Sequence, residues 1–373
     1  MEVLNIYIKS NTITFKRINE GRKLSMKESV LVLFGGQSSE HEVSLKSVTT
    51  IVNHIDQEKF EIYPVGITKE GKWLLYTGND LNFTSNRWDE VGIPAVLSPD
   101  ATMKSLVVLR EDMPVYIKID KVFPVLHGRN GEDGTIQGLC KLAEIPFVGC
   151  GVLASAVSMD KAFTKIVVKE KGVPQANFVL VYEREMKDED KVVERIENAF
   201  GYPYFIKPAN AGSSVGISKA HNKEELIAGI KEALKHDRKV LIEETIIGRE
   251  VETAVLGNEE IQVSGVGEIL AAAEFYDFDA KYNNAESKTV VDADLDPVIK
   301  EQIRAYAKDV FEAVEGKGIS RVDFFVKEDG GIIFNEINTL PGFTSISMYP
   351  MLFKAAGIET KELVTKLLDL AAL

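Results

Sequence analysis

Apolar residues in the first part of the chain form short continuous runs, each followed by a loop and a stretch with helical spacing. Ser29–Phe34 and Val122–Leu126 are unbroken apolar runs, as expected of parallel strands buried on both faces of a sheet. After the first run comes a glycine turn, and the apolar residues of Val43–Ile55 then recur with the period of a helix. Strand, glycine turn and helix form the unit of an open α/β sheet that binds ligands at the carboxyl ends of its strands. The pattern predicts an N-terminal α/β domain that ends near residue 150, at a Pro/Gly boundary.

The middle of the chain predicts two strands joined by a loop of small residues. Tyr204–Pro208 and Ile217–Ala220 have strand character, and glycine, serine and alanine dominate the loop between them. The loop matches neither the P-loop nor the dinucleotide motif, and no helix follows it. An ordinary Gly/Ser turn is one interpretation. The other is a flap whose N–H groups and hydroxyls cover phosphates, with Lys207 reaching inward from the strand.

Two more strand-like segments follow, Val240–Glu244 and Val251–Leu256, joined by the linker Thr245–Gly248. The backbone of such a linker offers donors and acceptors that can match a purine edge. Glu250 is placed for ribose hydroxyls, although each of these acids taken singly can also be an ordinary solvated side chain.

An Asp-Gly pair near the C-terminus predicts a β-hairpin. Residues 322–326 and 332–337 are apolar runs that flank Glu328–Gly331, and Asp-Gly is a strong two-residue hairpin signal. If Asp329 and Gly330 form the turn, strand pairing places Asp323 opposite Glu336. The same register places Arg321 opposite Asn338, so that all four side chains share one face of the hairpin.

Two facing carboxylates predict a cation at this hairpin. Like charges opposite each other destabilise a ladder, so folding alone does not favour Asp323 opposite Glu336. With the amide oxygen of Asn338 they form an incomplete oxygen shell, which suits Mg²⁺. A solvated hairpin face is the alternative, but Phe325 and Phe334 are expected on the same face and disfavour free exposure. A bulge or a three-residue loop would break this register.

Other polar residues lie at the ends of predicted elements, where loop residues often serve function. Glu40 follows the first strand and is either a helix-start carboxylate or a site residue. His127 follows the second apolar run and is either a structural histidine or a substrate contact. Ser158 is predicted to cap a helix that has Lys161 in its first turn. The helix dipole disfavours a cation there; a nearby phosphate would remove the conflict, and an exposed lysine would tolerate it.

The remaining segments predict a lid and two helices. Residues 274–284 are aromatic and charged without a helical or strand period, which is typical of an active-site lid. Asp296–Glu315 is predicted to be an amphipathic helix that packs beside the hairpin. Thr360–Ala371 carries one apolar stripe and is predicted to pack in the core.

Composition limits the classes of function. The 373 residues suffice for two or three domains, and a net charge of −13 argues against a general nucleic-acid or anionic-membrane surface. Two cysteines provide neither a disulfide framework nor a zinc motif. We find no apolar run of about 18 residues and no signal-peptide pattern, so we expect a soluble cytoplasmic protein without a membrane partner. Residues 1–26 are an N-terminal extension without an evident role.

Seven motifs in a fixed order identify a family. GGQSSEHEVS, HGRNGEDGTIQG, SMDKAFTK, IKPANAGSSVG, EFYDFDAKY, RVDFF and NEINTLPGFTS together resemble the D-alanine–D-alanine ligases of the ATP-grasp superfamily, over residues 29–373. The resemblance implies an α/β fold, α+β in its ATP-binding part. An N-terminal open parallel α/β domain (27–150) would precede a central (151–242) and a C-terminal (243–373) ATP-grasp subdomain, which grip the nucleotide between antiparallel sheets.

The resemblance also implies an activity. ATP would phosphorylate the carboxylate of one D-alanine, and the amine of a second D-alanine would attack the acyl phosphate to give a dipeptide for peptidoglycan synthesis. Two Mg²⁺ or Mn²⁺ ions per site and a homodimer are expected, with no nucleic-acid partner.

Roles of single residues follow from the same resemblance. Glu40 would hold the first substrate's ammonium in a triad with Ser213 and Tyr282, and Arg321 with the N–H of Gly342 would form an oxyanion site. The substrate contacts would be His127, Lys281 and Ser347, and the metal ligands Asp323, Glu336 and Asn338. The ATP contacts would be Lys161, Lys207, Ser214, Glu243, Glu244, Ile246, Glu250 and Lys281.

Alternatives remain at this point. The Lys281–Tyr282 pair is that of dipeptide-forming members and favours an amine nucleophile. The alternative interpretation is another carboxylate–amine ligase, or a D-alanine–D-lactate or D-serine ligase. Asn210, Ala211 and Thr245 depart from residues of some members and bear on nucleotide affinity and flap motion. A non-catalytic nucleotide-binding regulator is disfavoured, because the metal ligands and Arg321 are retained.

Overall fold

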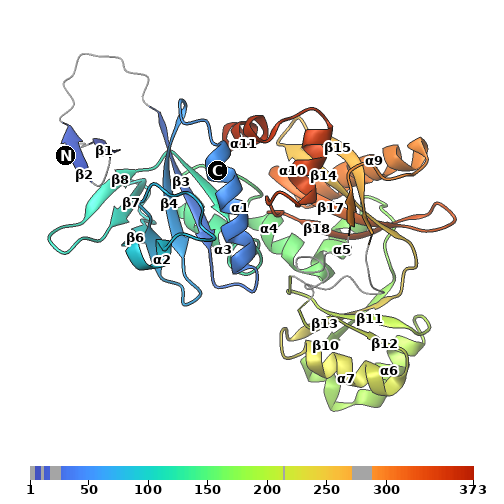
Figure 1. Ribbon diagram of the computed structural model, residues 1–373. Coiled ribbons are helices and arrows are strands. Elements are labelled where there is room, and N and C mark those ends of the chain that lie inside the picture. Colours follow the sequence, from blue (N-terminus) through green and yellow to red (C-terminus); the bar gives the residue numbers. More distant parts are fainter. Residues whose placement is uncertain (1–4, 10–11, 17–26, 213–214, 271–287) are drawn as a thin grey trace.

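The computed structural model describes residues 5–9, 12–16, 27–212, 215–270 and 288–373. Its elements form three main sheets (Figure 1), and one cavity, called the central space below, is lined by residues from or next to all three. A separate two-stranded antiparallel sheet, β1 (Asn5–Lys9) with β2 (Thr12–Lys16), precedes them. No helix in these ranges is long and apolar enough to cross a membrane.

The first main sheet has seven strands in the order β8-β7-β6-β5-β4-β3-β9. Both predicted apolar runs are strands of its parallel part, at one end of the sheet, where β3 (Glu28–Gly35) lies between β4 (Phe60–Ile67) and the edge strand β9 (Lys121–Val125). The remaining strands pair antiparallel, so the sheet is mixed rather than wholly parallel. They are β5 (Trp73–Leu75), β6 (Ile93–Leu97), β7 (Ser105–Val108) and β8 (Val115–Lys118). Its helices are α1 (His41–His54), α2 (Trp88–Val91) and α3 (Thr135–Leu142).

The second sheet is antiparallel and has the order β10-β13-β11-β12. The strands are β10 (Phe178–Tyr182), β11 (Tyr204–Pro208), β12 (Ser218–Ala220) and β13 (Lys239–Glu244). Helices α6 (Glu189–Glu197) and α7 (Lys223–Ala233) cover its outer face, as Figure 1 shows, and a 3₁₀-helix, η1 (Glu183–Lys187), follows β10. Ile196, Ile206 and Ile230 meet in a core of their own between the sheet and these helices. The other face of the sheet is left for the central space.

The third sheet is also antiparallel and has the order β16-β15-β14-β17-β18. The strands are β14 (Arg249–Gly257), β15 (Gln262–Leu270), β16 (Lys288–Val290), β17 (Gly318–Val326) and β18 (Ile332–Asn338). Helix α9 (Pro297–Ala313), capped by Asp296, packs on β14, β15, β17 and β18, as predicted for Asp296–Glu315. The other helices of this region are α4 (Val152–Met159), α5 (Lys161–Lys169), α10 (Met348–Ala355) and α11 (Thr360–Asp369). The exact domain boundaries stay a prediction.

The predicted cap of the helix at Lys161 is wrong. Ser158 belongs to the preceding helix α4, and the chain turns at Asp160. The Asp160 side chain accepts the N–H groups of Ala162 and Phe163, each at 3.1 Å. A carboxylate at the N-cap satisfies two free N–H groups of the first turn, which a serine two residues earlier does not reach. Lys161 lies in the first turn of α5, as predicted.

The β17–β18 hairpin has the predicted pairing at its site end but not the predicted path. Asp323 lies opposite Glu336 and Arg321 opposite Asn338, but Phe324 pairs with Phe334. The register therefore shifts by one residue between Asp323 and Phe324. A turn one residue longer than assumed is compensated by an extra residue in β18, a β-bulge.

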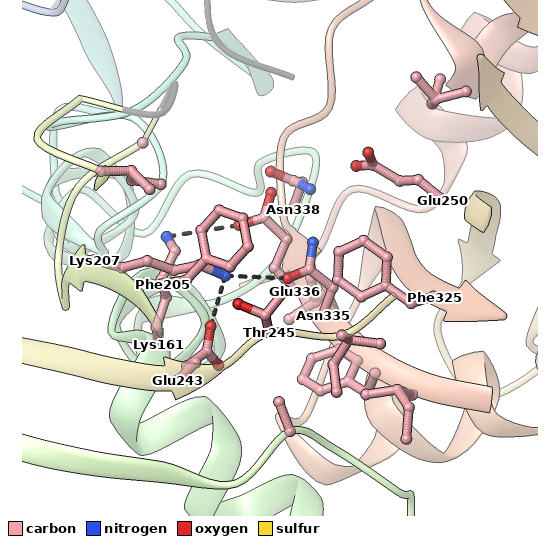
Figure 2. A pocket seen from close by; sticks show the side chains of 18 of the residues that line it. Lys161, Phe205, Lys207, Glu243, Thr245, Glu250, Phe325, Asn335, Glu336 and Asn338 are labelled. Atoms are coloured by element: carbon pink, nitrogen blue, oxygen red, sulfur yellow. Dashed lines mark hydrogen bonds and ion pairs between the residues drawn. The ribbon is translucent and has the colours of Figure 1, made fainter. Parts of the chain in front are cut away.

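The bulge overturns the expected position of two aromatic residues. Phe334 is buried against Phe324, with ring centroids 5.9 Å apart, whereas Phe325 faces the central space. The two phenylalanines expected on one face thus lie on opposite faces. The extra residue, Asn335, faces the space together with Glu336 (Figure 2), and bulges commonly redirect side chains in this way near active sites.

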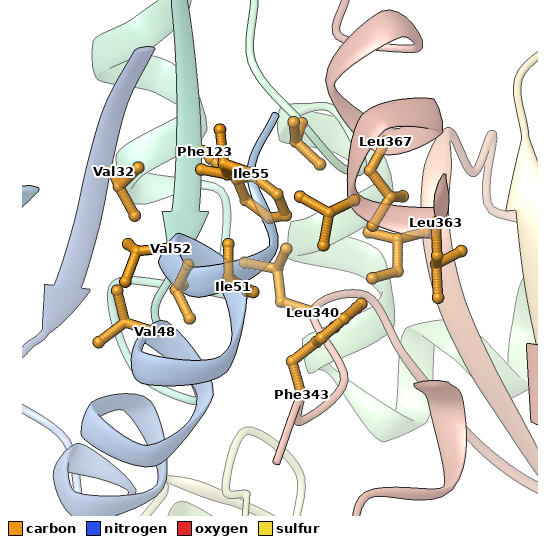
Figure 3. Packing of buried hydrophobic residues seen from close by; sticks show 14 of the residues in the cluster. Val32, Val48, Ile51, Val52, Ile55, Phe123, Leu340, Phe343, Leu363 and Leu367 are labelled. Carbon is orange, nitrogen blue, oxygen red and sulfur yellow. The ribbon is translucent and has the colours of Figure 1, made fainter. Parts of the chain in front are cut away.

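One apolar cluster joins the two ends of the chain. Ile51 and Ile55 of α1 pack with Leu363 and Leu367 of α11, as Figure 3 shows. Leu340 and Phe343, from the loop after β18, lie in the same cluster. The last helix is therefore core packing, as predicted, and the loop after β18 is held between the first and third sheets.

Candidate active site

A cavity with a volume of about 1050 Å³ lies between the three sheets. Glu40 and His127 line it from the loops after β3 and β9, at the carboxyl ends of parallel strands. Lys207 lines it from β11, and Arg321 and Glu336 line it from the hairpin. Groups that the sequence distributes over almost 300 residues therefore face one space.

A row of acids crosses three neighbouring strands on one face of the third sheet. Glu252 of β14 lies opposite Asp323 of β17, which lies opposite Glu336 of β18. Arg321 compensates the first two: its Nε and Nη2 donate to the two oxygens of Asp323 at 2.8 and 2.6 Å, and Nε lies 3.1 Å from Glu252. Burial alone would lower the pKa of Arg321, but the neighbouring carboxylates hold it well above its usual value. Arg321 is therefore a fixed cation inside the site.

The donor set fits a hard divalent cation. Asp323 and Glu336 contribute carboxylate oxygens, and Asn338 lies close enough for its Nδ2 to donate to Asp323 at 3.1 Å. Each carboxylate oxygen has two acceptor positions, so a cation can share these acids with Arg321. An oxygen-only set that leaves positions for water and phosphate suits Mg²⁺. Within the described ranges no three His, Cys, Asp or Glu residues are grouped as a metal site, so the amide of Asn338 is needed for a third protein ligand.

Two lysines approach these acids, Lys161 from the first turn of α5 and Lys207 from β11 of the second sheet (Figure 2). Lys161 Nζ lies 3.6 Å from Glu336 Oε2 and donates to the carbonyl oxygen of Ala211 at 2.9 Å. Lys207 Nζ lies 2.6 Å from Glu243 Oε2 and 3.4 Å from Asn335 Oδ1. The two lysines that the sequence analysis assigned to phosphate binding thus line the cavity.

Glu243 is held between two lysines rather than left open. Lys165 of α5 lies 2.7 Å from its Oε1, opposite Lys207 on Oε2, and both Glu243 and Lys165 are buried. Burial would raise the pKa of Glu243, but the two ammonium groups outweigh it and lower the pKa to about 2. The carboxylate is therefore ionised and orients Lys207. The sequence analysis missed Lys165, although its position one helical turn after Lys161 was a usable signal.

The linker after β13 lines the cavity as expected. Ile246, Glu250 and the linker backbone face it, whereas the carboxylate of Glu244 accepts both nitrogens of Asn177, at 2.8 and 3.1 Å. Thr245 donates its hydroxyl to the carbonyl oxygen of Pro203 at 2.7 Å. A ligand would meet this segment mainly through its backbone.

Glu40 lies where three loops meet. Its side chain makes no capping hydrogen bond to α1, so the structural alternative of a helix cap is not supported. A Cβ built on Gly128 would come within 2.7 Å of Glu40 Oε2, and one on Gly212 within 3.3 Å. Gly128 also has φ of +68°, which other residues rarely adopt. The glycines therefore allow the loop after β9 and the base of the flap to approach this carboxylate.

Both ring nitrogens of His127 have partners inside the protein. Nδ1 lies 2.8 Å from the carbonyl oxygen of Leu340, and Nε2 lies 3.1 Å from Ser47 Oγ. Burial lowers the pKa of His127, outweighing the negative charge of Glu40, and favours the neutral ring. The structural alternative for His127 is therefore present, while its ring also lines the cavity.

Glu132 is a buried acid that the sequence analysis did not single out. Its oxygens accept the N–H groups of Gly128 at 2.7 Å and Leu340 at 3.1 Å. Burial, and secondly the negative charge of Glu40, raise its pKa to about 8. The signal was the acid in HGRNGEDG, a loop that was read for its glycines.

Gly342 differs from its neighbours in the partner of its backbone N–H. Along Leu340–Thr344 the other N–H groups are bonded to side chains, and Pro341 has none. The N–H of Gly342 has no partner among the residues that the structure describes, and Gly342 lines the cavity. Ser347 lies behind it, with its Oγ accepting the N–H of Thr344 at 2.9 Å. Gly342 and Arg321 line the same cavity, and a backbone donor together with a guanidinium are the kinds of group that an oxyanion site uses.

Comparisons with known proteins agree on one family. The model of the D-ala D-ala ligase N-terminus matches residues 29–150, and that of the D-ala D-ala ligase C-terminus matches residues 167–369. The chain is 50% identical over 347 residues to a D-alanine–D-alanine ligase of Caldicellulosiruptor bescii, covering 92% of this chain and 95% of that protein. It is 51% identical over 360 residues to one of Acetivibrio thermocellus, covering 92% and 96%.

The chain belongs to the D-alanine–D-alanine ligase family.

Solved structures of this ligase family have the same fold. The VanG D-Ala:D-Ser ligase from Enterococcus faecalis aligns with a TM-score of 0.85 at 41% identity, covering 92% of this chain and 99% of that one. The D-alanine-D-alanine ligase from Coxiella burnetii aligns with a TM-score of 0.82 at 34% identity, covering 92% and 93%. The ATP-grasp fold expected from the motifs is thereby confirmed.

Some of the expected ligase residues lie outside the described part of the chain. They are Ser213, Ser214, Lys281 and Tyr282, together with the whole of the predicted lid at 274–284. Their roles stay predictions, as does the hydrogen-bonded triad with Glu40.

Proposed function

We propose that the chain joins two D-alanine molecules into a dipeptide, using ATP and a divalent cation. The observation that carries the proposal is that acids, lysines and a free backbone N–H of distant segments line one cavity, in a chain that belongs to this ligase family. The first carboxylate would attack the γ-phosphorus and release ADP, and the second substrate's amine would displace phosphate from the acyl phosphate. The dipeptide would serve peptidoglycan synthesis in the cytoplasm, where ATP is available.

Nucleotide binding would use the space between the second and third sheets. Lys161 and Lys207 would neutralise the phosphates, as phosphoryl transfer requires. The backbone around Ile246 would bind the purine edge, and Glu250 the ribose. Glu243 would act by orienting Lys207, and Glu244 by its backbone alone.

A divalent cation, Mg²⁺ or Mn²⁺, would be held by Asp323, Glu336 and Asn338, with two ions per site. When bound, it would neutralise charge on the transferring phosphate. The supporting feature is the row of carboxylates, which like-charge repulsion disfavours in the absence of a cation. Arg321 and Lys161 balance part of this charge and would remain near the phosphate oxygens.

The D-alanine sites would lie at the N-terminal-domain end of the cavity. Glu40 would bind the first ammonium, and Gly128 and Gly212 let two loops come close to this carboxylate and enclose it. Arg321 and the N–H of Gly342 would stabilise the oxyanion of the tetrahedral intermediate, since a guanidinium with five donors can serve Asp323 and a substrate together. Ser347 would contact the second carboxylate. His127 would shape the first subsite with its ring.

The deciding experiment measures phosphate release from the purified protein with ATP, Mg²⁺ and a panel of D-alanine, D-serine, D-lactate and L-alanine. We expect release with D-alanine alone, and mass spectrometry should find the dipeptide. Release only with D-serine or D-lactate as second substrate would reassign the specificity. No amino-acid-dependent release would contradict the proposal.

We also propose a homodimer. Leu142 of α3 and Leu153 of α4, which are contacting helices, are 67% and 57% exposed, which supports an apolar contact there. Sedimentation velocity should give about twice the mass of the 41.3 kDa chain.

A further inference from the structure

The loop that carries Gly342 is held from the N-terminal domain on both sides of that residue. Before Gly342, the carbonyl oxygen of Leu340 lies 2.8 Å from His127 Nδ1, and the N–H of Leu340 donates to Glu132 at 3.1 Å. After Gly342, the N–H of Phe343 donates to Ser47 Oγ at 3.0 Å. The three side chains come from α1 and from the loop after β9, almost 300 residues away from Gly342 in the case of Ser47.

The partners fix one another's proton positions. Because the Leu340 carbonyl can only accept, Nδ1 of His127 carries the proton and Nε2 is an acceptor. Ser47 must then donate its hydroxyl proton to Nε2, at 3.1 Å, and accept from Phe343 with its lone pair. The sequence of bonds is thus Phe343 N–H to Ser47, Ser47 O–H to His127, and His127 N–H to Leu340. A buried chain of this kind allows a single arrangement of the loop.

We propose that Ser47, His127 and Glu132 form an interdomain clamp that positions the N–H of Gly342 for the oxyanion of the tetrahedral intermediate. The inference rests on the function proposed for Gly342 and deepens it. Within the clamp Ser47 is a positioning residue, because it is fully buried and does not line the cavity.

The rest of the loop supports the clamp. The side chains of Leu340 and Phe343 are buried in the cluster that joins α1 to α11 (Figure 3), so the loop is fixed by packing as well as by hydrogen bonds. Between them Gly342 contributes no side chain of its own, and a Cβ there would come within 2.9 Å of Ser347 Oγ. An oxyanion donor acts only if it is held at the position the charge will occupy, and displacement by about 1 Å can cost about 100-fold in rate.

The chain offers a matched pair of variants on one helix. Ser44 and Ser47 both lie on α1 and are fully buried. Ser44 Oγ accepts the N–H of Gly35 at 2.7 Å and donates to the carbonyl oxygen of Val125, so its contacts stay within the first sheet. Ser47→Ala removes the two hydrogen bonds that Ser47 contributes to the clamp, while Ser44→Ala removes an equivalent pair of hydrogen bonds elsewhere.

The experiment compares kcat, the KM values, the Kd for ATP, and the affinity for a dipeptide analogue with a tetrahedral phosphinate in place of the peptide group. For Ser47→Ala we expect kcat to fall about 10- to 100-fold. The affinity for the phosphinate should fall in parallel, with the ATP Kd within about twofold. The melting temperature of Ser44→Ala should fall about as much as that of Ser47→Ala, while its kcat should stay within about threefold of the wild type.

A second readout does not depend on catalysis. Amide hydrogen exchange over residues 340–344 should accelerate in Ser47→Ala and remain as in the wild type in Ser44→Ala. If Ser47→Ala fails to fold, Ser47→Cys, with a weaker acceptor of similar shape, replaces it in both measurements. A wild-type protein without D-alanine-dependent turnover would reject the proposed function. An active wild type with unchanged kcat and unchanged exchange in the Ser47 variant would reject the clamp alone.

Discussion

At the scale of single residues, the site is organised by buried charges that compensate each other. Arg321 binds Asp323 in a bidentate pair beside Glu252, and Glu243 lies between Lys165 and Lys207. Removing one partner of a buried pair leaves the other desolvated and uncompensated, which costs more than the pair contributes. Such residues therefore couple stability to the shape of the site.

Glu243→Gln should expose this coupling. The variant leaves two lysines, one of which is the buried Lys165, beside a neutral amide. We therefore expect the free energy of unfolding to fall by about 3–5 kcal/mol. Urea unfolding provides the measurement. Glu244→Gln is the neighbouring control, since its amide oxygen can still accept from Asn177, and it should lose less than about 1 kcal/mol. Equal losses in the two variants would contradict the role of the lysine pair.

Glu132 should make stability depend on pH. With its pKa raised to about 8 from 4.5, the folded protein keeps a proton that the unfolded chain releases in this range, so stability should fall as pH rises from about 4.5 to 8. The negative charge of Glu40 adds to the rise in the pKa of Glu132, and the positive charge of Arg321 opposes it.

Glu132→Gln should remove the contribution of Glu132 to the slope of unfolding free energy against pH. Urea unfolding at pH 5 and pH 8 provides the measurement. Relative to the wild type, the free energy of unfolding of the variant should be higher at pH 8 than at pH 5, by a few kcal/mol at most. Glu328→Gln, at an exposed hairpin turn, controls for the loss of a charge. A slope that is identical in wild type and Glu132→Gln would contradict this prediction.

At the scale of elements, the β17–β18 hairpin shows how a correct pairing can follow from an incomplete argument. Alternation of side chains and the Asp-Gly turn predicted Asp323 opposite Glu336, and the structure confirms it. The one-residue register shift from the longer turn is cancelled by the extra residue of the bulge at Asn335. Sequence patterns do not specify a bulge, because a strand tolerates the extra residue locally. The position of Phe334 was wrong for this reason. Packing against Phe324 decided it.

Glu336→Gln tests the function of the hairpin. We expect ADP release with D-alanine to fall by at least about 100-fold, since a neutral amide binds Mg²⁺ weakly and leaves the transferring phosphate less neutralised. The melting temperature should change by only about 2–3 °C, because Glu336 is partly exposed and its carboxylate is repelled by that of Asp323. Coupled-enzyme turnover and calorimetry on the same preparation provide both values. Turnover at the wild-type rate would reject Glu336 as a metal ligand.

At the scale of the whole molecule, the last helix belongs structurally to the first domain as much as to the third. α11 packs on α1, and Ala372 exchanges two backbone hydrogen bonds with Phe147. The loop of Gly342 is enclosed in the same packing. The first and third sheets are therefore tied together by packing next to the cavity, and not only by the chain that links them.

Leu367→Ala should weaken the whole molecule. Leu367 is fully buried between α11 and α1, so truncation should cost about 2–5 kcal/mol of unfolding free energy. Leu373→Ala, at a position 53% exposed, should change it by less than about 0.5 kcal/mol. If the domains unfold together, fluorescence and circular dichroism should report a single shifted transition for Leu367→Ala; two separated transitions would show that α11 does not couple them.

By itself, the sequence determined the elements and the chemical classes in the site. The strands at Ser29–Phe34 and Val122–Leu126, the facing acids and the lysines follow from hydrophobic period, side-chain alternation and turn chemistry, which are properties of neighbouring residues. The family followed from seven motifs in order.

Only the tertiary structure decided which distant groups meet. Lys165 on Glu243, Arg321 on Glu252, and Ser47 on Phe343 are contacts between segments whose spacing in the chain contains no distance information. Whether a buried polar group is a ligand of the substrate or a partner of another side chain depends on packing in three dimensions. His127 and Glu132 acquire their partners in this way, because the domain interface brings the loop after β18 against them.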